Sequence, residues 1–317
     1  MTSTIFQGDV RDVLKALDAE SVQCVVTSPP YWGLRDYGVD KQIGLEETPE
    51  EYVTTMVEVF REVKRVLRDD GTLWLNLGDS YYSNFGGGSA TMSTGNATAI
   101  RTMGRRNKPP HELLKPKDLV GIPWRVAFAL QADGWYLRSD IIWAKGVSFC
   151  RAYSGTIMPE SVTDRPTKSH EYLFLLTKSA RYYYDAEAVK EPAQDWGSRD
   201  RTNWRGKINS PAGPQTGCTN SNFAESGRNL RSVWTINTKP YREAHFATFP
   251  EKLVEPCVKA GTKKGDTVLD PFAGSGTTGL VAGKLDRKFI GIELNEEYIR
   301  IANNRIEGPL FADPRFQ

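Results

Sequence analysis

Two short stretches, far apart in the chain, contain residues whose types and spacing could do chemistry. The first is a glycine-rich turn, DPFAGSGTTG at 270–279, which directly follows the apolar run at 267–269. Gly274 and Gly276 allow a ligand to approach the backbone closely, and the amides of such a turn lie near the positive end of the following helix. No Gly-Lys-Ser/Thr sequence follows, so this turn is a poor match to a phosphate-cradling P-loop.

Two acidic residues flank this turn. Glu293 ends the apolar run at 289–292, and a carboxylate in that place can accept hydrogen bonds from both ribose hydroxyls of an adenosine. Asp270 stands at the tip of the preceding strand, where it can meet the ammonium group that a sulfonium amino-acid cofactor carries and NAD lacks. A glycine turn alone would more readily be structural. Strand, turn, helix, strand and acid together indicate a cofactor site.

The second stretch is Thr27-Ser28-Pro29-Pro30-Tyr31-Trp32, which follows the apolar run at 23–27. Prolines have no amide N–H to donate, so this turn presents carbonyls and the Ser28 hydroxyl as acceptors. Tyr31 adds an aromatic face. Acceptors beside a stacking ring suit a flat base with an exocyclic NH₂ group. Taken in isolation, the stretch would more readily be a proline turn that closes a strand over a packed tyrosine.

An alternation of helices and buried strands must position these two stretches. The apolar spacing predicts strands at 4–6, 23–27, 72–77, 135–143, 172–177, 267–269 and 289–292. It predicts helices at 10–17, 49–67, 123–133, 249–260 and 296–306, the first capped by Asp9 and the second ended by Asp69-Asp70-Gly71. This order is typical of an α/β fold with a doubly wound, mostly parallel sheet.

Two basic, loop-rich segments interrupt the alternation. Residues 80–118 contain a glycine triplet and six Lys or Arg residues after position 100. Residues 196–242 contain eight basic residues against two acidic ones, an excess of +6 that is larger than the net charge of +2 for the whole chain. Because aromatic residues accompany the bases, the two segments indicate a surface for a polyanion.

Composition limits the class of protein. The chain has 317 residues, 39% of them hydrophobic and 25% charged, which is ordinary for a soluble globular protein. No apolar run is long enough to span a membrane and no secretory signal is visible, so we expect a cytoplasmic protein with no membrane partner. Four cysteines without a CxxC pair and three histidines argue against a metal site, and the cysteines are expected to be reduced core residues.

Four motifs together resemble the amino-methylating DNA methyltransferases. They are TSPPYW at 27–32, GTLWLNLGD at 71–79, FPEKL at 249–253 and LDPFAGSGTTG at 269–279. These enzymes use S-adenosyl-L-methionine and modify N4 of cytosine or N6 of adenine. The catalytic motif precedes the cofactor motif here, which resembles the circularly permuted order called the β class.

The resemblance implies a Rossmann-like fold in which the strand at 4–6 completes the sheet from the other end of the chain. It implies catalytic roles for Ser28, Pro29, Pro30 and Tyr31. It implies cofactor contacts from Asp9 (to the adenine), Asp270, Phe272, Gly274, Gly276, Thr277 and Glu293. Contacts with the DNA substrate are expected from Trp32, Arg105, Arg106, Arg201, Arg205 and Lys207.

The same resemblance suggests how the chain is divided. Residues 1–79 form the catalytic half, 80–118 a basic insertion, 119–190 a continuation of the catalytic domain, 191–244 a target-recognition region and 245–317 the cofactor-binding half. The resemblance also implies a prokaryotic or phage origin, and the expected partner is double-stranded DNA. A homodimer and a cognate restriction endonuclease that is not physically bound are left open.

The expected reaction is direct methyl transfer to the exocyclic amine of a base flipped out of the duplex. Ser28 tilts the expected base to cytosine N4, because the family's adenine-N6 members more often carry Asp before Pro-Pro-Tyr. Adenine N6 is the alternative, followed by a protein or RNA methyltransferase and a non-catalytic DNA-binding protein. A cytosine-C5 enzyme would need a nucleophilic cysteine beside prolines, whereas Cys24 and Cys257 fall inside a strand and a helix.

Overall fold

The computed structural model describes residues 2–34, 36, 38–39, 41–82, 111–150, 155, 157, 160–192, 227–238 and 249–312. Its strands are β1 (Ser3–Gln7), β2 (Val22–Thr27), β3 (Leu67–Leu77), β4 (Tyr136–Ala144), β5 (His170–Thr177), β6 (Val233–Thr235), β7 (Thr267–Asp270) and β8 (Lys288–Glu293). Its helices are α1 (Val10–Ala16), α2 (Pro49–Val66), α3 (Ile122–Ala132), the short 3₁₀ helix η1 (Glu187–Val189), α4 (Glu251–Gly261), α5 (Thr277–Lys284) and α6 (Glu296–Ala312).

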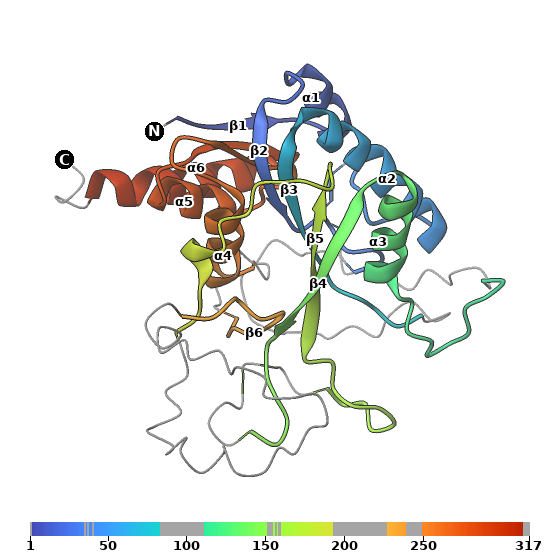
Figure 1. The fold of residues 1–317 in the computed structure, drawn as a ribbon. Helices are drawn as coiled ribbons and strands as arrows, with labels where there is room; N and C mark the ends of the chain where they lie inside the picture. Colours follow the sequence, from blue (N-terminus) through green and yellow to red (C-terminus); the bar gives the residue numbers. More distant parts are fainter. Residues whose placement is uncertain are drawn as a thin grey trace, which may run out of the picture.

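The described strands form one sheet in the order β1-β8-β7-β2-β3-β5-β4-β6. Neighbouring strands are parallel except where β5 pairs with β3 and β4. The first strand lies beside the last, with Ser3 opposite Phe289 and Gln7 opposite Glu293 (Figure 1). The predicted α/β class and the predicted completion of the sheet by the first strand are therefore confirmed.

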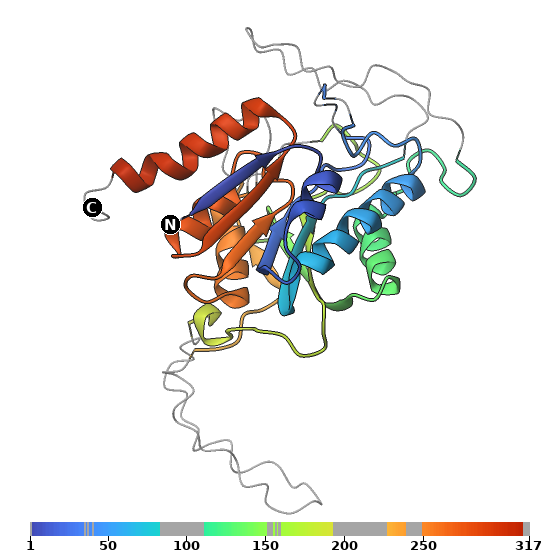
Figure 2. The ribbon, with the colours of Figure 1, turned by 90° about the horizontal axis from the view of Figure 1, so that it is seen from above.

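Helices cover both faces of the sheet. Helices α1, α2 and α3 lie on one face, and α4, α5 and α6 lie on the other (Figure 2). Each face has its own buried apolar cluster, one including Tyr52 and Phe60 from α2 and the other including Val254 and Val258 from α4. Because both faces are buried, β2 is apolar along most of its length and every residue in it is buried.

Local signals explain the long helix α2 and its end. Thr48 and Glu51 form a capping box at its start, and Pro49 occupies the first turn. The predicted stop at 69–71 is wrong, because α2 ends at Val66 and β3 begins at once with Leu67, which pairs with Val22 of β2. The short strand β6 was also missed, since its three residues lie inside a segment with few aliphatic side chains.

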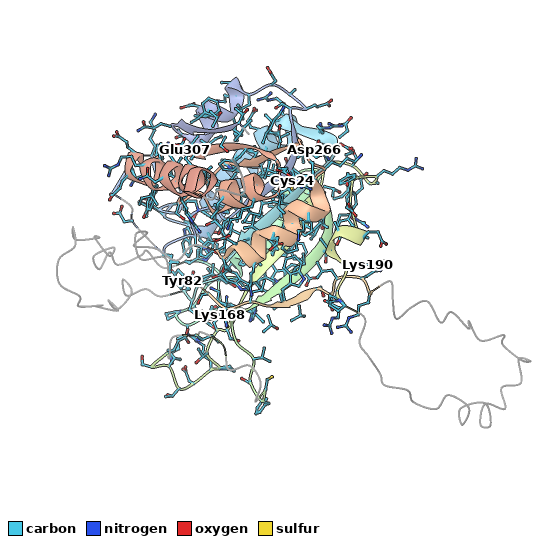
Figure 3. The ribbon with its side chains drawn as sticks, turned by 90° about the vertical axis from the view of Figure 1, so that its left-hand side faces the viewer. Cys24, Tyr82, Lys168, Lys190, Asp266 and Glu307 are labelled. Atoms are coloured by element: carbon cyan, nitrogen blue, oxygen red, sulfur yellow. The ribbon has the colours of Figure 1, made fainter. Side chains whose placement is uncertain are left out.

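The described cysteines are free thiols. Cys24 in β2 and Cys257 in α4 are fully buried, as predicted, and Figure 3 shows Cys24 inside the molecule. Burial raises the pKa of the Cys24 thiol to about 12, which disfavours a nucleophilic thiolate there. The prediction is wrong for Cys150, which is exposed.

Two further findings concern only the described part of the chain. None of the helices there combines the length and apolarity that a membrane crossing requires. Nor do three or more His, Cys, Asp or Glu side chains in those ranges gather where they could hold a metal ion.

Candidate functional site

The two stretches singled out in the sequence meet at one edge of the sheet. Since β1, β2, β7 and β8 are parallel, their carboxyl ends lie at the same edge, where ligands of open α/β sheets bind. A cavity of about 370 Å³ lies there. Its lining includes Asp9, Ser28, Pro29, Pro30, Tyr31, Phe272, Gly274, Thr277 and Glu293. The structure thus brings the proline turn and the glycine turn, almost 250 residues apart, into one site.

Glu293 anchors the glycine turn from the end of β8. One carboxylate oxygen accepts a hydrogen bond from the amide of Gly274 at 2.8 Å, and the other accepts one from the amide of Asn295 at 2.9 Å. Burial raises the pKa of this carboxyl group. Each oxygen keeps a second lone pair, so Glu293 can still accept hydrogen bonds from a ligand in the cavity that it lines.

Asp270 is placed differently from the expectation. It is 1% exposed and is absent from the cavity lining. Its carboxylate accepts hydrogen bonds from the hydroxyls of Thr27 and Thr278, both at 2.7 Å, and from the amide of Phe272 at 3.1 Å. Burial raises its pKa to about 6. The pairing of β2 with β7 places the Thr27 hydroxyl against this carboxylate. Asp270 therefore links the proline turn to the glycine turn and does not face the cavity.

Gly276 is likewise structural. It begins α5 with a φ of +75°, a backbone conformation that favours glycine. A Cβ atom on it would lie 2.8 Å from the Cβ of Ala302 in α6, so the glycine lets the two helices pack closely. Gly276 does not line the cavity, whereas Gly274 does.

Asp9 lines the cavity from the end of β1 and also caps α1. One carboxylate oxygen accepts from the amide and from the guanidinium Nε of Arg11, both at 2.9 Å. The hydrogen bonds from Arg11 hold the pKa of Asp9 below its usual value, so the group is ionised at neutral pH. It can therefore act only as a hydrogen-bond acceptor toward a ligand.

Tyr31 is the centre of a polar cluster that also lines the cavity. Its hydroxyl lies 2.8 Å from a carboxylate oxygen of Glu171, 3.2 Å from Oδ1 of Asn76 and 3.3 Å from the hydroxyl of Ser28. Burial, followed by the charge of Glu171, raises the pKa of the phenol well above its usual value. The ring packs against Gly78, where a Cβ atom would lie only 2.5 Å from ring carbon Cε2.

Trp32 is not part of the site. The side chain is 3% exposed within the apolar cluster under α2, and its indole N–H donates to the carbonyl of Glu46 at 3.0 Å. Tyr31 therefore lines the cavity, while Trp32 packs into the core. The expected contacts at Arg105, Arg106, Arg201, Arg205 and Lys207 lie outside the described residues.

Sequence reasoning missed several lining residues. They are Asn76 in β3, Trp143 and Lys145 at the end of β4, Glu171 at the start of β5, and Phe249 and Tyr298. Lys145 forms an ion pair with Glu171, and its ammonium lies 4.6 Å from the centre of the Trp143 ring. No local signal identifies Glu171, because its place in the site depends on the direction of β5 in the sheet. A strand antiparallel to its neighbours places its first residues, not its last, at the active edge.

The cavity suits a cationic cofactor that carries ribose and a flat base. Two carboxylates, from Asp9 and Glu293, lie on the side of the glycine turn and can accept hydrogen bonds from hydroxyls or amino groups. Apolar side chains such as Phe272 and Ile292 lie beside them and can contact the faces of a ring. These residues fit S-adenosyl-L-methionine.

Comparisons with known sequences agree on one family. A family model described as DNA methylase, for N6 and N4 methyltransferases, matches residues 22–304. The type II methyltransferase M.Cfr9I of Citrobacter freundii is 52% identical over 306 residues, covering 96% of this chain and 88% of the relative. The type II methyltransferase M.SmaI of Serratia marcescens is 50% identical over 302 residues, covering 95% and 90%.

Solved structures show the same architecture. A putative DNA modification methylase from Thermus thermophilus, complexed with S-adenosyl-L-methionine, superposes with a TM-score of 0.59 at 25% identity, covering 98% of this chain and 96% of the other. The cytosine-N4-specific PvuII DNA methyltransferase superposes with a TM-score of 0.65 at 20% identity, covering 100% and 89%. At 20% identity the second likeness concerns the fold.

Proposed function

Because this chain belongs to the N6/N4 DNA methylase family, we propose that it methylates N4 of a cytosine flipped out of double-stranded DNA. It is a DNA methyltransferase that uses S-adenosyl-L-methionine, and the choice of base and the residue roles below are the proposal. One observation carries these roles: the Ser28–Tyr31 turn and the Gly274–Glu293 pair line the same cavity.

On one side of the cavity the chain holds the methyl donor. When bound, S-adenosyl-L-methionine supplies an electrophilic methyl group on a positively charged sulfur. Glu293 would accept hydrogen bonds from the ribose hydroxyls of the bound donor, and Asp9 would accept one from its adenine amino group. Gly274 keeps its backbone within reach of the ligand, because its amide is fixed on Glu293 at 2.8 Å. The buried carboxylate of Asp270 holds this turn in place by accepting a hydrogen bond from the amide of Phe272.

On the other side the chain holds the base. The amine lone pair of cytosine is conjugated with the ring and is a weak nucleophile. The hydroxyl of Ser28 and the carbonyl of Pro29 would accept hydrogen bonds from the two amine hydrogens, which would direct the lone pair toward the methyl group. As the nitrogen bonds to the methyl carbon, the carbon–sulfur bond breaks and one amine proton is released to solvent. Tyr31 stacks on the base, and such stacking contributes about 1–3 kcal/mol, which offsets much of the cost of unstacking. The Pro30 carbonyl is already bonded to the Tyr52 hydroxyl at 2.9 Å, so Pro30 shapes the turn.

Nucleoside analysis tests the choice of base. DNA incubated with the enzyme and deuterium-labelled S-adenosyl-L-methionine is digested, and the nucleosides are separated by mass spectrometry. We expect labelled N4-methylcytosine and no labelled N6-methyladenine. N6-methyladenine alone would overturn the choice of cytosine, and an unlabelled digest would overturn the proposed reaction.

The region 191–244 is proposed to read the DNA sequence, and Arg105, Arg106, Arg201, Arg205 and Lys207 to contact DNA. The charge excess in the second basic segment supports this proposal, since phosphate contacts dominate DNA affinity. DNA affinity that does not fall as salt rises would contradict it. The type II relatives support a further proposal, that the enzyme protects DNA from a restriction endonuclease with the same target. Formation of a homodimer stays a prediction. Sedimentation at two protein concentrations, which gives the molar mass in solution, tests it.

A further inference from the structure

The hydroxyl of Tyr31 lies among three oxygen atoms, and only one of them belongs to a residue of the proline turn. Glu171 and Asn76 reach it from β5 and β3, at 2.8 and 3.2 Å, and Ser28 reaches it at 3.3 Å. The position of each proton in this cluster follows from what each partner can donate. The hydrogen bonds of this cluster therefore run in one order, from donor to acceptor.

Two of the three neighbours can only accept. An ionised carboxylate has no proton to give, and Glu171 is paired with the ammonium of Lys145. Asn76 donates through its amide nitrogen to the carbonyl of Tyr172 at 3.0 Å, which turns its oxygen toward Tyr31. The tyrosine proton consequently points to these two groups, and the nearer and charged one, Glu171, is the stronger acceptor. Burial keeps the proton on Tyr31, because it raises the pKa of the phenol.

The lone pairs of the Tyr31 oxygen then face the one remaining partner, Ser28, whose hydroxyl donates to it. With its own proton committed to Tyr31, the Ser28 oxygen presents lone pairs to the cavity. That is the polarity an exocyclic amine requires, since the amine must donate its hydrogens. If the Ser28 hydroxyl pointed into the cavity instead, its proton would face the amine hydrogens and could not accept a hydrogen bond from them.

We propose that Glu171 is a positioning residue that sets the direction of the Ser28 hydroxyl through Tyr31, so that Ser28 can only accept from the amine of the target base. This rests on the proposed function. Lys145 holds the carboxylate in place, and the pair is largely shielded, with side-chain exposures of 24% for Lys145 and 15% for Glu171. Glu171 acts through other residues and forms no bond with the methyl group.

Glu171→Gln tests the proposal with little change in shape. The amide oxygen of the new side chain stays on Lys145, so its nitrogen donates to Tyr31. The tyrosine proton then loses its nearer, charged acceptor and is shared between Asn76 and Ser28, so the Ser28 hydroxyl is no longer held in one direction. We expect the single-turnover rate of methyl transfer to fall roughly 10- to 100-fold. Calorimetric affinities for S-adenosyl-L-methionine and DNA, and the thermal midpoint, should stay near the wild-type values. Glu255→Gln removes the carboxylate of another Glu–Lys pair, on the surface of α4, and serves as the matched control.

A double-mutant cycle separates positioning from a structural role. Tyr31→Phe removes the link, so Glu171→Gln should slow transfer no further in that background. An unchanged rate in Glu171→Gln, or rate losses that multiply in the double variant, would overturn the proposal. If the wild-type enzyme itself transfers no methyl group to cytosine, the proposed function fails instead. The two failures are thus told apart by the wild-type reaction.

Discussion

Gly78 is the position where the structure predicts the largest effect from the smallest change. It follows β3 directly and is buried against the ring of Tyr31. An added Cβ would lie 2.5, 2.9 and 3.2 Å from three ring carbons, and the shortest of these is closer than real Cβ contacts. The φ of Gly78 is not in the left-handed region, so alanine meets a collision with the ring rather than a strained backbone.

The size of the effect follows from the displacement. The ring must move by roughly 1 Å to restore an ordinary carbon–carbon contact, which carbon atoms reach at about 3.5–4.0 Å. A shift of that size misplaces a reacting group enough to cost about 100-fold in rate, equal to about 2.7 kcal/mol in activation free energy. Overpacking should also lower the free energy of unfolding by about 1–3 kcal/mol.

The assay is single-turnover transfer of a labelled methyl group to DNA, run well below the unfolding temperature. Gly308→Ala, where an added Cβ meets nothing within 4 Å, is the control and should behave as wild type. In a Tyr31→Ala background, Gly78→Ala should slow transfer no further, because the ring is gone. A Gly78→Ala enzyme within about threefold of the wild-type rate would refute the claim that the ring position matters.

Three other substitutions test the residues around the glycine turn. Glu293→Ala should weaken binding of S-adenosyl-L-methionine at least about tenfold, since it removes the acceptor that anchors the Gly274 amide; calorimetry measures this, and Glu255→Ala should bind normally. The buried Asp270 has a folded pKa of about 6 against 3.8, so its contribution to stability is present below pH 4 and is lost as the pH rises through 6. The free energy of unfolding of wild type relative to Asp270→Asn should therefore fall by about 3 kcal/mol between pH 4 and 7 in urea titrations, and a constant difference would contradict the assignment. Asp9→Ala should lower the free energy of unfolding by about 1 kcal/mol through loss of the α1 cap, measured in the same way, and should weaken cofactor binding as well; an effect on stability alone would limit Asp9 to capping.

The sequence alone determined most of the strands and helices and the two chemical turns. Buried parallel strands such as β2 are continuous apolar runs, and helices such as α2 have caps and an apolar stripe, so local physics identifies both. It also predicted that the first strand lies beside the last. The resemblance to the permuted methyltransferases implied this completion of the sheet, and β1 pairs with β8 as predicted.

Only the tertiary structure decided which polar groups face the cavity. Asp270 and Glu293 look alike in the sequence, each at a strand end, yet the pairing of β2 with β7 buries the first beneath Thr27 and leaves the second open. Glu171 carries no local signal at all. It reaches Tyr31 because β5 runs antiparallel, which brings a carboxylate 140 positions away in the chain to within 2.8 Å of the phenol. Contacts between residues on distant strands depend on the register and the direction in which the strands pair. Neither can be deduced from the residues next to each site residue in the sequence.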